Sequence, residues 1–132
     1  MATKDSNRRD FTRLRTALKV RYKFLSSTVK DRRLDEICEG STINVSIGGL
    51  LLVGPIPNMD WVKEMLVGRM TVGVNFQLPL SHQPLKALTR LAWVEAVDDE
   101  AITVRMGLRV VDIPAEHRSA LSEFIIKEAA VP

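Results

Sequence analysis

Apolar and polar residues alternate along several stretches of the chain, which is the pattern of a β-strand that buries one face. The three clearest stretches are residues 18–24, 70–78 and 102–110. Residues 85–97 form a longer stretch whose imperfect alternation indicates a β-bulge. Shorter apolar segments at 42–45 and 50–53 flank a polar turn at 46–49. The pattern therefore predicts about six strands.

Two segments have helical spacing instead. Trp61 and Met65 recur at i and i+4, which favours one or two helical turns over residues 60–67 and places Trp61 in the core. Pro114 opens a C-terminal helix, where its missing N–H costs nothing. The apolar stripe of that helix comprises Leu121, Phe124, Ile125 and Glu128/Ala129. Residues 29–40 are charged and irregular, which indicates a loop or a twisted strand edge. The fold class predicted is mainly β: a small six-stranded antiparallel β-barrel plugged by a C-terminal α-helix.

Length and composition are those of a single globular domain. The chain has 132 residues, of which 45% are hydrophobic and 27% charged. No apolar run approaches the roughly 18 residues that a membrane-spanning helix needs, and the N-terminus has no apolar stretch of the secretory type. Cys38 is the only cysteine, so a disulfide within the chain is impossible, and a bystander thiol is favoured over a nucleophile. We expect a cytoplasmic protein with no membrane association.

Charge is concentrated at the N-terminal end. Residues 1–33 contain eleven Lys or Arg and three Asp or Glu, whereas residues 34–132 contain eight and thirteen. A basic arm therefore precedes a mildly acidic body. Such an arm attracts phosphates, nucleic acid or an acidic membrane surface, unless it is only a solvated charged tail.

Two short motifs lie about thirty residues apart near the start of the chain. Arg9 and Arg13 form an RxxxR pattern directly after Arg8, and Asn44, Ser46 and Gly49 form an N-x-S-x-x-G pattern. In this order, ahead of a β-rich remainder, they resemble the RxxxR and [D/N]xSxxG motifs of PilZ domains. The segment Gly107-Leu108-Arg109-Val110 also resembles the G-[LI]-x-[FV] strand common late in that family.

The resemblance implies a single PilZ-like domain over residues 8–130 after a flexible leader at 1–7. It also implies binding of the bacterial second messenger cyclic di-GMP, with no other cofactor. The guanidinium groups of Arg8, Arg9 and Arg13 suit this ligand, because arginine can pair with phosphate, grip the O6 and N7 atoms of guanine and stack on a base. In the family, an arginine directly before RxxxR accompanies binding of an intercalated nucleotide pair. Two molecules per chain are therefore expected.

The second motif supplies small polar groups. Asn44 can hydrogen-bond a guanine edge, although family members more often carry Asp there, and Ser46 can donate to a phosphate or base. Gly48 and Gly49 are expected to permit a positive φ and to leave room for the ligand. Trp93 is placed either against the ligand, as the resemblance implies, or in the core. Taken alone, the second motif is more typical of an ordinary turn between strands, and its position relative to the arginines is what favours the binding motif.

Catalysis has little support, so we expect a protein that is not an enzyme. The chain has no GxxxxGK[ST] loop and no G-x-S-x-G elbow, and Ser46 has no nearby histidine. His82 and His117 lack the spacing of a metal site. With no room for an output domain, the receptor would change the conformation of its arginine arm on binding and signal in trans to an unknown partner protein. The alternatives are a degenerate PilZ-type protein-interaction module without nucleotide binding, and a general nucleic-acid binder. DNA or RNA binding is not expected, because an aromatic stacking platform is missing.

Overall fold

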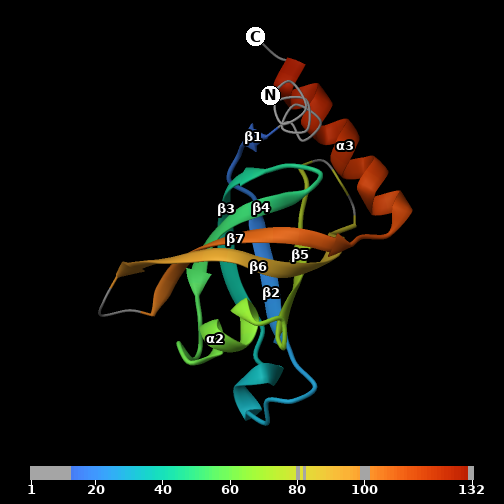
Figure 1. Cartoon of the computed structure of the whole chain (residues 1–132). Helices are drawn as coiled ribbons and strands as arrows, with labels where there is room; N and C mark the ends of the chain where they lie inside the picture. Colours follow the sequence, from blue (N-terminus) through green and yellow to red (C-terminus); the bar gives the residue numbers. More distant parts are fainter. Residues whose placement is uncertain (1–12, 80, 82, 99–101, 131–132) are drawn as a thin grey trace, which may run out of the picture.

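A barrel of antiparallel strands with a helix at one end makes up the part of the chain that the computed structural model describes, residues 13–79, 81, 83–98 and 102–130 (Figure 1). Its elements are β1 (Leu14–Arg15), β2 (Lys19–Leu25), the 3₁₀ helix η1 (Arg32–Asp35), β3 (Cys38–Val45), β4 (Gly49–Pro55), α2 (Trp61–Leu66), β5 (Thr71–Phe76), β6 (Leu85–Asp98), β7 (Thr103–Asp112) and α3 (Ala115–Ala130). The strand order is β1-β3-β2-β5-β6-β7-β4, and an additional pairing of β3 with β4 closes the barrel. The predicted six-stranded barrel is confirmed, and the short β1 is added to it beside the end of β3.

Alternating side chains of the strands fill the barrel. In β2, Val20, Tyr22 and Phe24 point inward and are each 1% exposed. The Tyr22 hydroxyl donates a hydrogen bond to the Pro55 carbonyl oxygen at 2.6 Å. Burial raises the pKa of Tyr22 above its ordinary value, so the hydroxyl stays protonated and remains a donor. At the far end of the barrel the Phe24 ring contacts Trp61 of α2 at a centroid distance of 5.4 Å, and Trp61 is buried as predicted.

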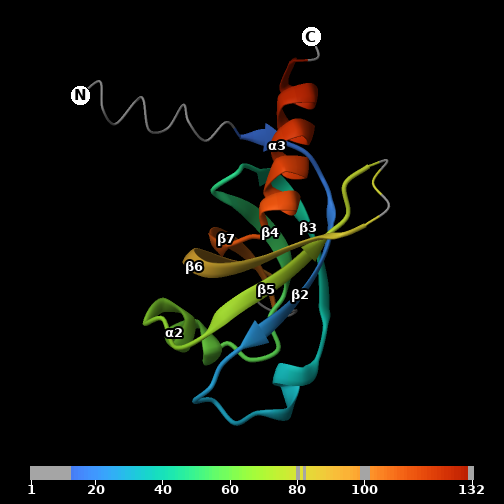
Figure 2. The ribbon, with the colours of Figure 1, turned by 90° about the vertical axis from the view of Figure 1, so that its right-hand side faces the viewer.

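Helix α3 stands at the opposite end of the barrel from α2 (Figures 1 and 2). Leu121 and Ile125 are buried, whereas Glu128 and Ala129 are exposed, so the predicted apolar stripe ends one turn early. The Pro114 carbonyl accepts a hydrogen bond from the Arg118 N–H at 2.9 Å, which makes Pro114 the cap before the helix. Among the described residues no helix combines the length and apolarity needed to cross a bilayer.

The start of β3 is the main departure from the predicted elements. The strand begins at Cys38, inside the segment predicted as a loop or twisted edge, and η1 precedes it. Two of its inward positions carry Gly40 and Thr42, which interrupt the apolar alternation. Gly40 has no side chain because an ideal Cβ there would lie 2.4 Å from the Val53 carbonyl oxygen. Because β3 packs closely on β4, its first half lacks the apolar alternation that would have predicted a strand.

Candidate functional site

The turn between β3 and β4 is held by Ser46. Its backbone N–H donates to the Gly49 carbonyl oxygen at 2.8 Å, and its Oγ accepts from the Gly49 N–H at 3.1 Å. The same hydroxyl lies 3.3 Å from the Gly49 carbonyl oxygen, to which it donates. Ser46 is therefore engaged within the turn, and what it retains for a ligand is an acceptor lone pair.

Gly49 is required by close packing. An ideal Cβ at this position would lie 2.2 Å from the Leu108 carbonyl oxygen on β7, a contact that real Cβ atoms do not make. The expectation that Gly48 and Gly49 adopt a positive φ was wrong, since Gly68 is the glycine with a positive φ among the described residues. The Gly48 carbonyl accepts from the Val110 N–H at 2.8 Å. Both glycines thus hold the turn tightly against β7.

A β-bulge in β6 places Trp93 on the outside of the barrel. Leu91 pairs with Leu108, but Trp93 pairs with Gly107, so Ala92 is an extra residue in β6. Leu91 points inward, and regular alternation would send Trp93 inward as well. Trp93 is instead 44% exposed, and its indole Nε1 would lie 2.2 Å from an ideal Cβ at Gly107. The predicted bulge is confirmed, and the core placement of Trp93 is wrong.

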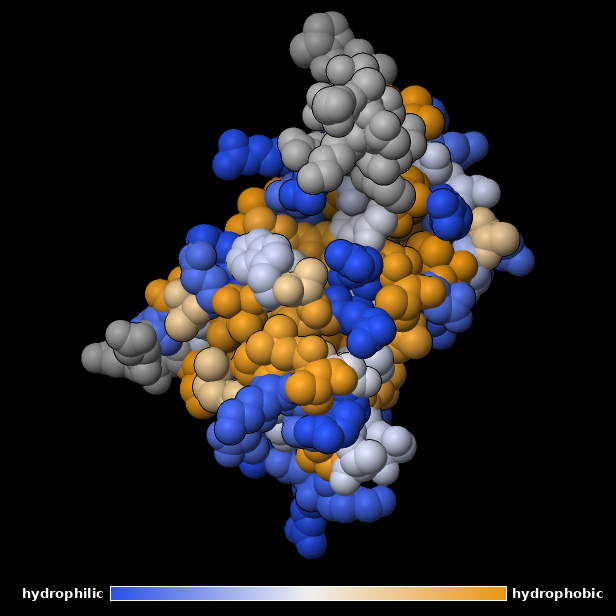
Figure 3. Space-filling model, in the orientation of Figure 1, coloured by the Kyte–Doolittle hydropathy of each residue, from blue (hydrophilic) through white to orange (hydrophobic). Residues whose placement is uncertain are grey.

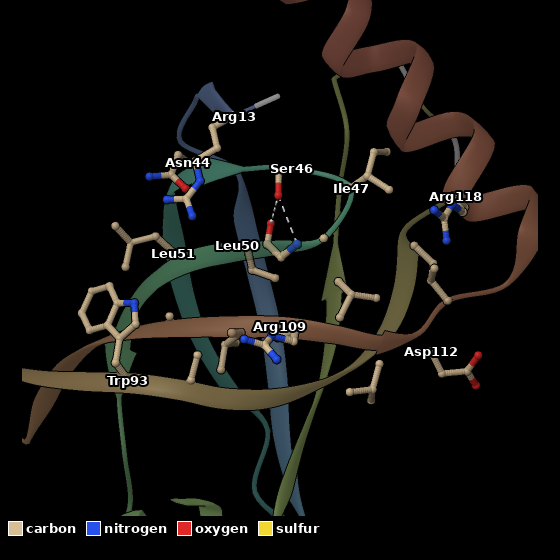
Figure 4. A pocket seen from close by; sticks show the side chains of 18 residues that line it. Arg13, Asn44, Ser46, Ile47, Leu50, Leu51, Trp93, Arg109, Asp112 and Arg118 are labelled. Carbon is tan, nitrogen blue, oxygen red and sulfur yellow. Dashed lines mark hydrogen bonds between the residues drawn. The ribbon is translucent and has the colours of Figure 1, made fainter. Parts of the chain in front are cut away.

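These features surround one open groove of about 860 Å³ on the outer wall of the barrel (Figure 4). Its floor is the outer face of β7, with Gly107 and Arg109, and Trp93 stands at one side. The Ser46–Gly49 turn forms the upper edge, and Arg118 reaches in from α3. Hydrophobic side chains surround a small group of hydrophilic ones on this face of the molecule (Figure 3). The volume of the groove is within the roughly 300–1,000 Å³ range of small-molecule sites.

The structure brings Arg13 to the same groove as the second motif. Arg13 and Asn44 both line it, and their side chains lie close together in Figure 4. The chain after Arg13 is attached to β3, where Leu14 pairs with Val45 and Arg15 with Asn44. Arg8 and Arg9 lie outside the described residues, as does the predicted leader at 1–7.

Buried Thr42 fixes that attachment. Its Oγ1 accepts a hydrogen bond from the Leu18 N–H at 2.8 Å and donates to the Thr16 carbonyl oxygen. The Thr16 N–H in turn donates to the Ile43 carbonyl at 3.2 Å. The segment that carries Arg13 is thus tied to β3 by side-chain and backbone hydrogen bonds.

Arg109 and Arg118 are groove residues that sequence reasoning did not select. Together with Arg13 they supply three guanidinium groups, against the single carboxylate of Asp112 among the described lining residues. Arg109 is paired with Gly49 across β4 and β7, so it lies next to the second motif in space although sixty residues separate them. Its alternation with Gly107 in β7 was the available signal for an outward side chain. The local excess of positive charge favours an anionic ligand.

The two histidines and the cysteine lie outside the groove or outside the described residues. His117 is half-buried, and its Nδ1 accepts a hydrogen bond from the Lys86 N–H at 3.0 Å. His82 is not among the described residues. Cys38 is buried, and burial raises the pKa of its thiol. Among the described residues no group of three or more His, Cys, Asp or Glu could hold a metal ion.

Fold and groove together define a small closed β-barrel domain with a groove on its outer wall that is lined by Arg13, Arg109 and Arg118, which we call the arginine groove. Residues 7–127 match the family model of the PilZ domain, so the chain belongs to the PilZ domain family. No curated protein matches it significantly.

Solved structures show the same fold at low sequence identity. The inhibitor of motility MotI/DgrA of Bacillus subtilis has a TM-score of 0.64 and 16% identity, covering 90% of this chain and 50% of its own. The chain thus spans about half the length of that protein. The PilZ domain of CeSA from a cellulose-synthesizing bacterium has a TM-score of 0.57 and 14% identity over 89% of this chain and 98% of its own. The PilZ domain of YcgR from Escherichia coli, solved with c-di-GMP, has a TM-score of 0.55 and 13% identity, covering 92% and 94%.

Proposed function

We propose that this chain is a cyclic di-GMP receptor that signals in trans to a partner protein. The observation that carries the proposal is the meeting of Arg13, Asn44 and Trp93 in one groove, although they come from three separate segments of the chain. Membership of the PilZ domain family and a fold shared with a domain solved with c-di-GMP support it.

The groove offers chemistry suited to each part of this ligand. The phosphates are anionic, and Arg13, Arg109 and Arg118 provide charge-assisted donors around the groove. The exposed Trp93 ring provides a planar face on which a guanine can stack. Asn44 offers both donors and an acceptor for a guanine edge. In this proposal Ser46 and Gly49 contribute mainly by holding the upper edge in place, and Arg8 and Arg9 add cations from the segment before Arg13.

Calorimetric titration with cyclic di-GMP tests the proposal, with GTP and single-stranded DNA as controls. We expect saturable binding of cyclic di-GMP alone, weakened at least about tenfold by Arg13→Ala because a charge-assisted contact is lost. Arg69→Ala is the matched control, since Arg69 is exposed and pairs with Glu64 away from the groove. Absence of binding by the wild type would favour the degenerate PilZ-type protein-interaction module instead.

A second part of the proposal concerns the arginine arm as the switch. Residues 14 and 15 are paired with β3, so we assign a ligand-dependent change to the residues before Arg13. Amide exchange at residues 8–12 is expected to slow when cyclic di-GMP is added, whereas Leu14 and Arg15 change little. Equal exchange of residues 8–12 with and without nucleotide would require a different switch.

A further inference from the structure

A second groove, of about 450 Å³, lies on the outer face of β2, β5 and β6, the strands seen side by side in Figure 2. Among the described residues, three cations line it, Arg21, Lys23 and Lys86, and they come from the two strands on either side of β5. The register places Arg21 opposite Asn75 and Asn75 opposite Lys86, so two of these cations stand in one row across the sheet. We refer to this surface as the basic groove.

The floor of the basic groove is hollow at Gly73. In the next row across the sheet, Lys23 pairs with Gly73 and Gly73 with Leu88, so a position without a side chain lies between two long ones. Unlike Gly49, Gly73 is not required by packing. An ideal Cβ there would meet only the end of the Leu25 side chain at 3.3 Å and the Lys23 carbonyl oxygen at 3.9 Å. A glycine inside a strand lowers stability, and such a position often marks the close approach of another molecule.

Apolar side chains flank the same hollow. Leu25 is 40% exposed and Ile37 is 58% exposed, and both line the groove. The nearest counter-charge of Arg21 is Glu39, but their closest atoms are 3.9 Å apart and both side chains are more than half exposed, so the pair is weak. Asp112 stands at the other edge, where it also lines the arginine groove. The centre of the basic groove therefore combines cations that are at most weakly paired, among the described residues, with an apolar hollow.

We propose that the basic groove docks an acidic segment of a partner protein, with one large apolar side chain of that segment seated over Gly73 and carboxylates on either side paired with Lys23, Arg21 and Lys86. Charge complementarity selects an acidic partner, and the apolar hollow selects a polypeptide rather than a phosphate chain. Nucleic acid is disfavoured because, among the described residues, the one aromatic residue that lines this groove is Tyr22, whose buried ring offers no stacking face. The proposal does not depend on nucleotide binding in the other groove.

An NMR titration of the isotope-labelled chain with the peptide acetyl-EDELEDE-amide, in the absence of nucleotide, tests it. Amide shifts are expected in β2, β5 and β6 around Lys23, Gly73 and Lys86. The double variant Lys23→Glu/Lys86→Glu should weaken binding at least about tenfold, because attraction becomes repulsion. The matched control Lys63→Glu/Lys127→Glu makes the same change of net charge at exposed positions of α2 and α3, and should weaken it less than about twofold.

A third variant separates shape from charge. Gly73→Val fills the hollow without changing any charge, and should weaken peptide binding about tenfold while thermal stability stays equal or rises. The proposal is overturned if peptide shifts are absent or map elsewhere, or if both double variants weaken binding equally. It is also overturned if oligo-dT or phosphatidylglycerol vesicles shift the same residues at lower concentration, which would assign the face to nucleic acid or to a membrane surface. Because no nucleotide is present in the peptide titration, the result of that titration is independent of the calorimetric titration with cyclic di-GMP.

Discussion

Among single residues, Arg109 lies on the floor of the arginine groove beside Gly49 and faces outward from β7. Arg109→Ala is expected to lower cyclic di-GMP affinity about tenfold, because one guanidinium contact to phosphate or guanine is lost. The side chain is exposed, so the melting temperature should barely change. Calorimetry and a thermal melt on the same sample measure both effects, with Arg69→Ala as control. An affinity equal to that of the wild type would remove Arg109 from the site.

Gly49 is the residue at which the turn and the barrel wall meet. Gly49→Ala places a Cβ about where the Leu108 backbone carbonyl already lies, so β4 and β7 must separate. We expect a loss of about 1–3 kcal/mol in the free energy of unfolding, as for other overpacked sites. Denaturant unfolding measures it, and Gly73→Ala is the control glycine substitution, since the only tight contact of its Cβ would be with the end of the flexible Leu25 side chain. Equal effects of the two substitutions would contradict the packing role of Gly49.

At the scale of elements, the hydrogen bonds of Thr42 attach the segment that carries Arg13 to β3. Thr42→Val leaves the Leu18 N–H and the Thr16 carbonyl without this partner, which should cost about 1–3 kcal/mol of stability. Cyclic di-GMP affinity should fall as well, because Arg13 is then held less firmly. Thr42→Ser keeps the hydroxyl and is expected to restore most of both properties. Amide exchange at Leu18 and calorimetry follow the two effects, and wild-type affinity in Thr42→Val would show that Arg13 needs no such anchor.

Elements with strict alternation were predictable from the sequence, and those shaped by contacts between strands were not. β2, β5 and β7 follow from their alternating residues, and the bulge in β6 follows from the break in its pattern. The start of β3 could not be predicted in this way, because the close approach of β4 requires a glycine at position 40, where the alternating pattern would have an apolar residue. In the groove, Arg13 and Asn44 were found through their motifs. Arg109 and Arg118 were missed because the pairing of β4 with β7 brings Arg109 to the groove and the docking of α3 brings Arg118. Residue spacing along the chain predicts neither of these long-range contacts.

At the scale of the whole molecule, the number of bound nucleotides is the quantity to measure. We propose two cyclic di-GMP molecules per chain, since Arg8 directly precedes the RxxxR pattern. Its guanidinium, added to those of Arg9 and Arg13, would offset the charge of a stacked nucleotide pair. Arg8→Leu is expected to shift the calorimetric ratio toward one while binding persists. Arg8 lies outside the described residues, so this prediction rests on the sequence. A ratio near one for the wild type at saturation would leave Arg8 as a general phosphate contact.

The extra residue at Ala92 has a consequence for how members of this family are compared. Because strand residues alternate sides, one inserted residue reverses the facing of the residues that follow it in β6, as far as the next shift of register between Ala96 and Asp98. Trp93 reaches the groove only through that reversal. A relative that lacks the insertion but retains the tryptophan would direct the ring into the barrel. Sequence alignments should therefore treat a one-residue gap near Ala92 as a change in which side chain lines the groove, even where the neighbouring residues are identical.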